Sequence, residues 1–442
     1  MSIAPKIAYP LMIILLLVGL LGGYFAGQAT APAATRTVTV GGVEITKTYT
    51  LTVSPGVGLS GEIPIGVLTP LSGPLSSFGA QYKAVAEVVE KEINNYLAAI
   101  GRAWRIKVIL EDTAADPKTC LDKLMVLHGR GVKVFLGVET SSEIAEIKSY
   151  IDANKLLVIS PSSTSPALAI KDMAVRYTPN DIYQGKAIAK IMWLRGVRWI
   201  VPMWRGDAWG DGLSDSSLKT FREICEASGE SCGILESIRY DPNAKEFSVE
   251  IAKLNDIVSR AIASYGKDKV GVLLLAFEET AAIFSAAKTY PNLGEVVWQG
   301  SDGTAGVTPL LDPAVADFSI KVKFYSTIAS PGVSPKVDKV KNLIKEKLGT
   351  EAMGYTYFFY DSLWTAVLAI DIAGVYDGEA VLKALPYVLD HYIGASGPII
   401  LDENGDRAIG DYDLWAIAFK DGKYQWEVIG IYKALTDTLE YY

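Results

Sequence analysis

Short apolar runs and longer amphipathic segments alternate along most of the chain. Residues 63–69 (IPIGVLT) form one apolar run, and in the next segment Val85, Val89 and Ile93 recur at helical spacing on one stripe. Repeated strand–helix pairs of this kind predict a mostly parallel sheet with helices on both faces. The expected strands are residues 63–69, 105–112, 132–137, 156–160, 197–204, 233–240, 270–276 and 295–301.

The strand–helix pattern runs to about residue 160 and starts again near residue 197, which predicts two lobes. Two further helical segments, residues 334–349 and 355–374, follow the second unit and are expected to complete the first lobe. Residues 413–433 read as two strands on either side of Asp421-Gly422, a dipeptide typical of a β-hairpin turn.

The N-terminal segment predicts export. Residues Ile7 to Gly27 carry no charge, and their length suits either a secretory signal or a membrane helix of about 20 residues. No cysteine follows for lipid attachment, so we favour a retained anchor helix over residues 1–28. Residues 29–60 are rich in Thr, Val and Gly and are interpreted as a stalk, in which the alternation around Gly41-Gly42 predicts a hairpin.

Composition removes several classes of function. The 442-residue chain has a formal net charge of −8 and a pI near 5.1, whereas a nucleic-acid-binding protein needs a basic face. Its two histidines, His128 and His391, lie far apart in the sequence, which disfavours metal sites and general-base catalysis. We therefore expect no nucleic-acid partner, no metal and no cofactor.

Three cysteines remain to be explained. Cys225 and Cys232 lie at the end of a predicted helix and just before the next strand, so in an oxidising exterior they are expected to form a disulfide. A zinc site would need two more ligands nearby, and the sequence offers none there. Cys120 is expected to be a buried free thiol.

Two predicted strands end in clusters of small hydroxyl side chains. One cluster lies in VISPSSTSPAL (residues 158–168) and the other in GVETSSE (residues 137–143). Ligands of α/β folds bind at the carboxyl ends of parallel strands, and helix N-termini there favour anions. The alternative is plain helix capping, by Ser165 before Pro166 and by a capping box of Thr140 with Glu143.

Seven segments, in order along the chain, resemble one known family. The chain is similar to the type I periplasmic solute-binding proteins of ABC transporters, in particular to their leucine/isoleucine/valine-binding branch. The resemblance covers about residue 61 to the C-terminus and leaves the stalk outside. Its segments are residues 63–79, 108–120, 158–168, 177–189, 207–213, 298–303 and 397–406.

The resemblance implies an α/β fold of two Rossmann-like lobes with parallel sheets. Three crossovers join the lobes, and here they would fall near residues 178–181, 327–330 and 408–411. The hydrophobic N-terminal helix and the stalk precede this body. The expected division is lobe 1 at residues 61–179 and 329–408, and lobe 2 at residues 180–328 and 409–442.

The resemblance also implies a ligand site. Hydroxyls and backbone N–H groups of two loops in the first lobe would hold an α-carboxylate, and an acid of the second lobe, Asp302, would hold the α-ammonium. Many family members have a longer glutamate where Asp302 stands. The other expected ligand-binding residues are Ser141, Ser142, Ser162, Ser163 and Thr164 for the carboxylate, and the aromatic residues Phe78, Trp209 and Phe277.

The ligand's side chain is left open by the sequence. Phenylalanine at position 78 and tryptophan at position 209, where the family usually has tyrosine, favour an apolar ligand, although these aromatic residues could equally be core. Three nearby acids, Glu139, Glu278 and Glu279, could instead favour a polar or cationic ligand.

The function that the resemblance implies is an extracytoplasmic receptor of an ABC importer. It would be a monomer that hands a small amino acid, branched-chain or otherwise apolar, to permease and ATPase subunits in the membrane. The alternatives are binding of short amides, urea-like solutes or carboxylates, and a sensory or surface-layer role on the same fold. An enzyme is not expected, because the sequence lacks a G-x-S-x-G elbow, a metal cluster and a phosphate loop.

Overall fold

The computed structural model describes residues 34–40, 43–49 and 58–442. The expected membrane segment and much of the stalk lie outside these residues. Strands β1 (Ala34–Val40) and β2 (Val43–Tyr49) pair antiparallel, with Val40 opposite Val43. This pairing confirms the hairpin predicted around Gly41-Gly42.

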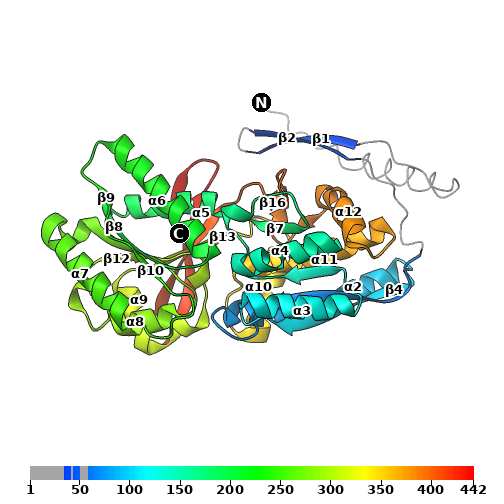
Figure 1. The fold of residues 1–442 in the computed structure, drawn as a ribbon, viewed down its shortest axis with the longest axis horizontal. Helices are drawn as coiled ribbons and strands as arrows, with labels where there is room; N and C mark the ends of the chain where they lie inside the picture. Colours follow the sequence, from blue (N-terminus) through cyan, green and yellow to red (C-terminus); the bar gives the residue numbers. More distant parts are fainter. Residues whose placement is uncertain (1–33, 41–42, 50–57) are drawn as a thin grey trace, which may run out of the picture.

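The first lobe is built on a parallel sheet with the strand order β16-β7-β6-β5-β3-β4. It lies to the right in Figure 1. Its strands are β3 (Gly61–Thr69), β4 (Trp104–Asp112), β5 (Val134–Gly137), β6 (Leu157–Ser160), β7 (Ala174–Pro179) and β16 (Asp406–Arg407). Its helices are α2 (Ser76–Ala99), α3 (Pro117–Gly129), α4 (Ser141–Asn154), α10 (Val337–Leu348), α11 (Gly354–Ala373) and α12 (Gly378–His391).

The second lobe, to the left in Figure 1, is built on a mixed sheet. Parallel strands in the order β10-β8-β11-β12-β13 continue into an antiparallel meander β17-β18-β19, which contains the hairpin predicted at Asp421-Gly422. The strands are β8 (Trp199–Arg205), β9 (Gly233–Ile234), β10 (Ile238–Tyr240), β11 (Val270–Leu275), β12 (Val297–Gln299), β13 (Tyr325–Ala329), β17 (Tyr412–Lys420), β18 (Lys423–Lys433) and β19 (Thr438–Tyr441). The helices are α5 (Asp181–Leu194), α6 (Ala208–Ser228), α7 (Ser248–Tyr265), α8 (Thr280–Ala287) and α9 (Pro313–Lys321).

One expected strand, residues 233–240, is wrong as a single element. It forms two short edge strands, β9 beside Trp199–Ile200 and β10 beside Met203–Arg205 of β8. Pro202 of β8 lies in the interval between them. Proline has no N–H to donate to a ladder, so pairing is interrupted at that point.

The chain passes between the two sheets at three places. It leaves the first sheet after β7, returns to the first lobe after β13, and crosses again between β16 and β17. The first and third crossings are linked by Arg407, which ends β16 and whose guanidinium donates to the carbonyl oxygen of Tyr177 in β7 and to those of Ser396 and Pro398. Because Arg407 is buried, these hydrogen bonds fix the path of the chain where it changes lobes.

Local capping sets where the helices start. The side chain of Asp116 accepts the Thr119 N–H at the start of α3, and Asp207 accepts the Gly210 N–H at the start of α6. Helix α2 differs, because its N-cap residue is Leu75, which has no side-chain oxygen. The first N–H groups of α2 therefore need partners from elsewhere in the molecule.

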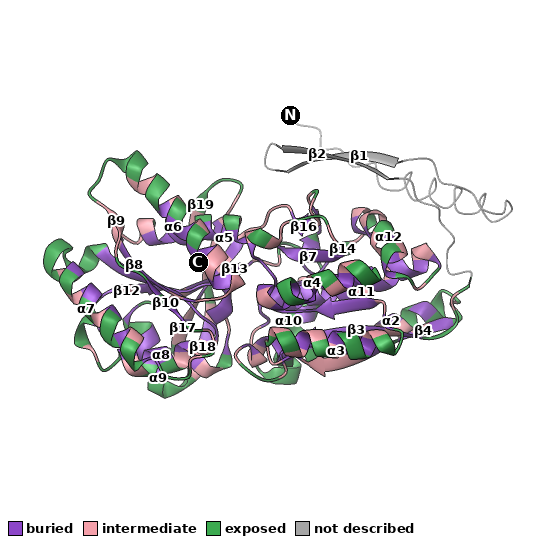
Figure 2. Ribbon diagram, in the orientation of Figure 1, coloured by how far each residue is buried: buried purple, intermediate pink, exposed green. Residues whose placement is uncertain are grey.

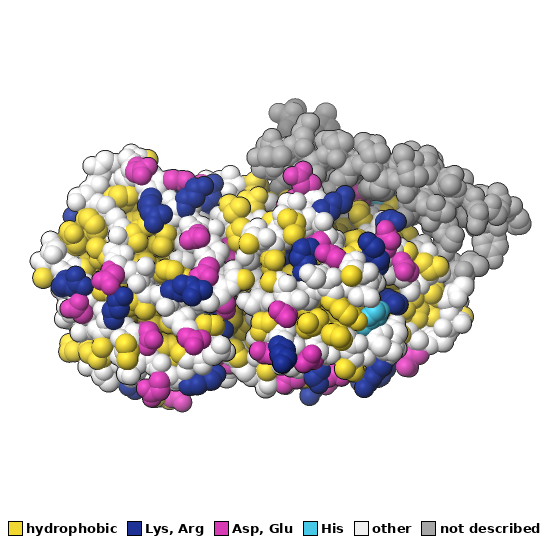
Figure 3. All heavy atoms as spheres, in the orientation of Figure 1, with side chains coloured by type: hydrophobic (Ala, Val, Ile, Leu, Met, Phe, Trp, Pro, Cys, Tyr) yellow, Lys and Arg dark blue, Asp and Glu magenta, His cyan; other side chains and the backbone are white. Residues whose placement is uncertain are grey.

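The central strands of both sheets are buried, while the helices show alternating buried and exposed stripes (Figure 2). Acidic and basic side chains are interspersed over both lobes on the face shown in Figure 3. Within the described residues no single helix is long and apolar enough to cross a membrane. Helices α11 and α12 reach the required length and composition only if they are counted together, and they are bent by 109° relative to each other. Most of α11 is buried inside the first lobe.

The structure joins Cys225 and Cys232 by a disulfide, with their Cα atoms 5.9 Å apart. The bridge closes the turn between α6 and β9. Cys120 is free and buried, and burial raises the pKa of its thiol.

A buried ion pair lies beneath the hydroxyl loop that follows β6. Arg176 of β7 and Asp406 of β16 have side chains only 2% exposed each, and the Arg176 Nε donates to Asp406 Oδ1 at 2.6 Å. The Arg176 Nη2 donates to Asp406 Oδ2, and the Nη1 donates to the carbonyl oxygen of Ser165 at 2.7 Å. One guanidinium thus joins two strands and the loop.

Replacement of Asp406 should therefore destabilise the whole first lobe. Asp406→Ala leaves a buried guanidinium without its counter-charge, so we expect the free energy of unfolding to fall by about 3–5 kcal/mol. Asp406→Asn retains an acceptor oxygen and should cost less. Urea denaturation of the two variants checks this, and equal stability of Asp406→Ala and the parent protein would contradict it.

Candidate functional site

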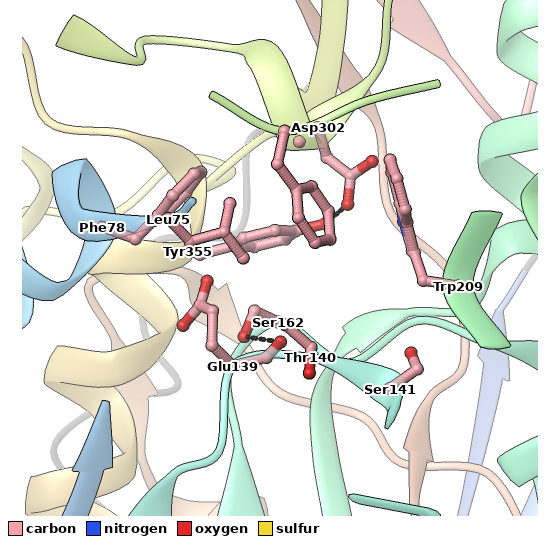
Figure 4. A pocket seen from close by; sticks show the side chains of 11 residues that line it. Leu75, Phe78, Glu139, Thr140, Ser141, Ser162, Trp209, Asp302 and Tyr355 are labelled. Atoms are coloured by element: carbon pink, nitrogen blue, oxygen red, sulfur yellow. Dashed lines mark hydrogen bonds between the residues drawn. The ribbon is translucent and has the colours of Figure 1, made fainter. Parts of the chain in front are cut away.

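A small cavity of about 20 Å³ lies between the two lobes. Figure 4 shows residues from both lobes around it. The first lobe contributes the loops after β5 and β6 and the start of α2 and α11, and the second contributes the start of α6 and the segments after β11 and β12. The lining residues are Leu75, Phe78, Glu139, Thr140, Ser141, Ser162, Trp209, Phe277, Asp302, Gly303 and Tyr355.

The two hydroxyl loops of the first lobe are tied to each other. Ser160 Oγ donates to the carbonyl oxygen of Val138 at 2.9 Å, and Ser162 Oγ donates to that of Glu139 at 2.9 Å. In return Ser141 Oγ accepts the N–H groups of Thr164 and Ser165 at 3.2 and 3.1 Å. The clustered hydroxyls therefore position two loops that are far apart in the sequence.

Ser141 has a proton left to donate. A hydroxyl has two lone pairs and one O–H, and two backbone N–H groups already occupy the lone pairs of Ser141. Its own proton is then directed at Ser163 Oγ, 3.1 Å away. Ser141 belongs to the cavity lining, so this O–H, if it turns away from Ser163, is the kind of donor that an anion accepts.

The capping alternatives have different outcomes in the two loops. Thr140 and Glu143 form the predicted capping box at the start of α4, with the Glu143 carboxylate accepting from the Thr140 N–H at 2.8 Å. Ser165 takes the expected N-cap position before Pro166, but only of a short turn and without a capping hydrogen bond. This element, Pro166–Leu168, is a single 3₁₀ turn. The arrangement pairs the N–H of Ser165 with Ser141, so this loop is fixed by another loop instead of by a helix start.

Thr164 faces an acid of the chain itself. Its hydroxyl donates to Asp181 Oδ2 at 3.0 Å, and both residues are buried. Burial raises the pKa of Asp181, and the nearby Asp302 raises it further. The Thr164 hydroxyl is thus engaged outside the cavity lining.

Asp302 is held from two directions. Gln184 donates to Asp302 Oδ1 at 3.0 Å, and the Tyr355 hydroxyl donates to Oδ2 at 2.6 Å (Figure 4). Burial raises the pKa of Asp302 to about 6, although these two hydrogen bonds act in the opposite direction. Two uncharged polar partners therefore fix the carboxylate in the wall of the cavity.

Glu139 is presented by a strained turn. Val138 has φ of 54°, a left-handed conformation that costs a β-branched residue about 1–3 kcal/mol, and Gly137 before it has φ of 87°. The Val138 N–H donates to the carbonyl oxygen of Leu68 at 2.7 Å, which stabilises this turn. The turn directs the Glu139 carboxyl group toward Phe78 and Leu75 in the view of Figure 4.

Aromatic rings form the wall opposite the hydroxyl loops. Trp209 and Phe277 pack with ring centroids 4.6 Å apart, and the guanidinium of Arg205 covers Phe277 at 4.3 Å. Gly303 lets them approach, because a Cβ there would lie 2.5 Å from the carbonyl oxygen of Ala276 and 3.0 Å from the Trp209 ring. The cavity is therefore apolar on one side and polar on the other.

The other two nearby acids have partners away from the cavity. Glu279 accepts from Arg205 at 2.7 Å and from the Tyr240 hydroxyl at 2.9 Å. Glu278 reaches from the second lobe to the start of α2, where it accepts the Ser77 N–H at 2.8 Å and the Ser76 hydroxyl at 3.1 Å. Glu278 thus supplies the cap that Leu75 lacks, and it links the two lobes.

The structure brings most of the sequence-predicted site residues together. Phe78, Ser141, Ser162, Trp209, Phe277 and Asp302 line one cavity. Ser163 and Thr164 lie just behind it, and Ser142 lines a neighbouring hollow with Arg205 and Asp207.

Sequence reasoning did not assign Leu75, Tyr355 or Gln184 to the site. Tyr355 stands at the start of α11 in a sequence that reads as a buried helix, YTYFFYDSLW, and nothing in its pattern separates it from core. Gln184 belongs to a segment that carried the family resemblance, but its amide contacts Asp302 across 118 positions.

Comparison with known proteins places this architecture. Residues 81–419 match the family described as receptor family ligand binding region. An uncharacterized protein of Methanocaldococcus jannaschii is 31% identical, and the match covers 96% of this chain and 98% of that protein. The Leu/Ile/Val-binding protein homolog 3 of Brucella melitensis is 26% identical, over 82% of this chain and 92% of its own length.

The fold agrees with a solved structure of the same architecture. The leucine binding protein LivK of Thermotoga maritima superposes with a TM-score of 0.66 at 21% identity, covering 83% of this chain and 98% of that one. This family is one of solute-binding proteins and not of enzymes. With two α/β lobes, a cavity between them and these matches, the chain belongs to the type I periplasmic binding proteins, the receptor ligand-binding family to which the Leu/Ile/Val-binding protein homologues are related.

Proposed function

We propose that this protein is the extracytoplasmic solute receptor of an ABC importer, and that it captures one small α-amino acid between its lobes. The observation that carries the proposal is the position of Asp302. A carboxylate of the second lobe faces hydroxyl loops of the first lobe across a closed cavity. A zwitterion has the matching charges, and in a low-dielectric cavity each charge needs a partner.

The first lobe suits the α-carboxylate. The Ser141 proton can turn from Ser163 to a ligand oxygen, while the loops remain tied by Ser160 and Ser162. The indole N–H of Trp209 is buried without an acceptor among the described residues, and in Figure 4 Trp209 faces Ser141 from the opposite wall at the same end of the cavity. These donors hold an anion without a basic side chain in the cavity wall.

The second lobe suits the α-ammonium. Asp302 is fixed by Gln184 and Tyr355, so it keeps its position when a cation approaches. The rings of Phe78, Trp209 and Phe277 then cover the carbon skeleton of the ligand. Relatives named Leu/Ile/Val-binding proteins support an amino acid as the solute class.

Closure over the ligand would use Glu278. This carboxylate meets the start of α2, and the Glu278 N–H donates to the carbonyl oxygen of Pro74 at 3.0 Å. Opening the cleft exposes these groups to water, so the contact favours the closed form by a modest amount.

A thermal-shift panel tests the proposed function. A ligand that binds only the folded protein stabilises it by about 2.7 kcal/mol at a hundred times its Kd. We expect α-amino acids to raise the melting temperature of the full chain, and acetamide, urea and 4-hydroxybenzoate to leave it unchanged. A shift with only these last three compounds would contradict an amino-acid ligand, and no shift with any compound would contradict the receptor function.

Asp302→Asn tests the ammonium partner. Loss of the counter-charge in a closed cavity should weaken amino-acid binding by about two to three decades at pH 8. In the parent protein the affinity should rise between pH 5 and pH 7, because Asp302, with a pKa of about 6, must lose its proton to pair with the ammonium. Calorimetric titration across this range should give a flatter profile for the variant.

The stability of the unliganded protein depends on pH in the opposite direction to the affinity for the ligand. The folded-state pKa of Asp302 is raised, so its contribution to stability is present below about pH 4 and is lost as the pH rises to 6. The titratable groups that interact with Asp302 are Asp181, Tyr355, Tyr412 and Glu139. Unchanged affinity of Asp302→Asn at pH 8 would contradict the pairing of Asp302 with the ligand's ammonium group.

Glu278→Ala tests closure at a residue outside the cavity. Removal of the interlobe cap should weaken binding by roughly threefold to tenfold, the effect of about one lost hydrogen bond, because the closed form loses its advantage. Ser76→Ala, which removes only the hydroxyl contact, is the matched control and should have a smaller effect. Scattering curves should show a larger open fraction for Glu278→Ala at subsaturating ligand, and identical affinities in all three proteins would exclude a closing role.

A further inference from the structure

Glu139 has a carboxyl oxygen that the chain does not use. The residue is 4% exposed and lines the cavity. Its Oε1 accepts a long hydrogen bond of 3.3 Å from the Tyr82 hydroxyl, and its Oε2 has no hydrogen-bond partner among the described residues. A buried acceptor without a donor costs about 1–3 kcal/mol, so a partner that arrives with the ligand would recover that cost.

The cavity wall has one more carboxyl group than a simple zwitterion can pair. Among the described residues that line it are two carboxyl groups, Glu139 and Asp302, and no lysine or arginine. An α-ammonium provides a partner for Asp302 only. Burial raises the pKa of Glu139 to about 8, and the nearby Glu143 and Asp302 act in the same direction. At pH 7 the Glu139 carboxyl group is therefore mostly protonated in the empty cavity, and an ammonium group next to it would favour the ionised form.

A purely structural role does not account for Glu139. The strained turn at Val138 places the carboxyl group in the cavity wall, whereas a tyrosine hydroxyl could be satisfied by an uncharged acceptor at no such cost. Tyr82 itself is held by stacking on Phe359, with ring centroids 4.5 Å apart. In Figure 4 the Glu139 carboxyl group points to the side of the cavity away from Trp209 and Ser141.

We propose that the ligand's side chain ends in a hydrogen-bond donor, an amide or an ammonium group, and that Glu139 receives it. This inference rests on the proposed function, since the α-carboxylate at Ser141 and the α-ammonium at Asp302 orient the side chain toward Glu139. Leu75 and the rings of Phe78, Trp209 and Phe277 enclose the carbon stem between the two polar ends. A purely aliphatic side chain would leave the buried Glu139 oxygen without a donor, so the site discriminates against leucine.

Four amino acids of nearly equal size test this assignment. Leucine offers only methyl groups, asparagine an amide, 2,4-diaminobutyrate an ammonium group and aspartate a carboxylate. The full chain should bind asparagine or 2,4-diaminobutyrate roughly tenfold to a hundredfold more tightly than leucine, and it should bind aspartate most weakly. Calorimetric titration at pH 7 gives these ratios.

Variants assign the preference to Glu139. Glu139→Leu should reverse the order, with leucine above asparagine, and Glu139→Gln should keep asparagine but lose 2,4-diaminobutyrate. Glu146→Gln, which changes the net charge equally at an exposed position of α4, should leave all ratios unchanged. Because Glu139→Gln is nearly isosteric, it remains informative if Glu139→Leu folds poorly.

The outcomes separate the two proposals. Leucine binding as tightly as asparagine in the parent protein, or ratios that stay the same in both Glu139 variants, would overturn the role of Glu139 and leave the amino-acid receptor intact. Tightest binding of aspartate would overturn it as well. No binding of any of the four amino acids to the parent protein or to the variants would overturn the proposed function itself.

Discussion

The pairing of Arg176 with Asp406 is the interaction on which the arrangement of the first lobe depends. A guanidinium buried this deeply requires a counter-charge, and among the described strands it is β16 that brings one beside β7, after the chain has returned from the second lobe. The same guanidinium holds the carbonyl oxygen of Ser165. The loop that follows β6 therefore takes its final position only when residues more than two hundred positions later are in place.

The position of this loop explains the role of the clustered hydroxyl side chains. The loops after β5 and β6 expose polar backbone groups at the edge of the sheet, and Ser141, Ser160 and Ser162 satisfy them across the gap. Hydroxyls are suited to this because they donate and accept at once and carry no charge that needs solvation. The result is a wall of two connected loops in a cavity that also has the carboxyl groups of Glu139 and Asp302 in its lining.

Capping also couples the two lobes. In most helices of this fold the cap comes from the neighbouring residue, as with Asp116 in α3 and Asp207 in α6. Helix α2 has Leu75 as its N-cap residue, and the acceptor for its first N–H groups is Glu278 of the second lobe. A helix terminus whose N–H groups are satisfied by the other lobe joins the two lobes by hydrogen bonds. Leu75 itself is then free to line the cavity.

The sequence by itself determined the features that depend on near neighbours. Period and run length identified the parallel strands β3, β4, β5, β6, β8, β11 and β12, but not β7, β13 or β16. The Asp421-Gly422 dipeptide located a hairpin, and Thr140 with Glu143 identified a capping box, because these interactions lie within a few residues. The family resemblance also placed Asp302, Ser141 and the aromatic residues at one site.

Only the tertiary structure decided which polar groups face the cavity. Glu139, Glu278 and Glu279 were equivalent in the sequence, yet one lines the cavity, one caps a helix of the other lobe and one pairs with Arg205. The strand expected over residues 233–240 was divided in the same way, by a proline of a neighbouring strand. In each case the partner is distant in the sequence, and the direction of a side chain at the end of a strand is set by what the rest of the fold brings next to it.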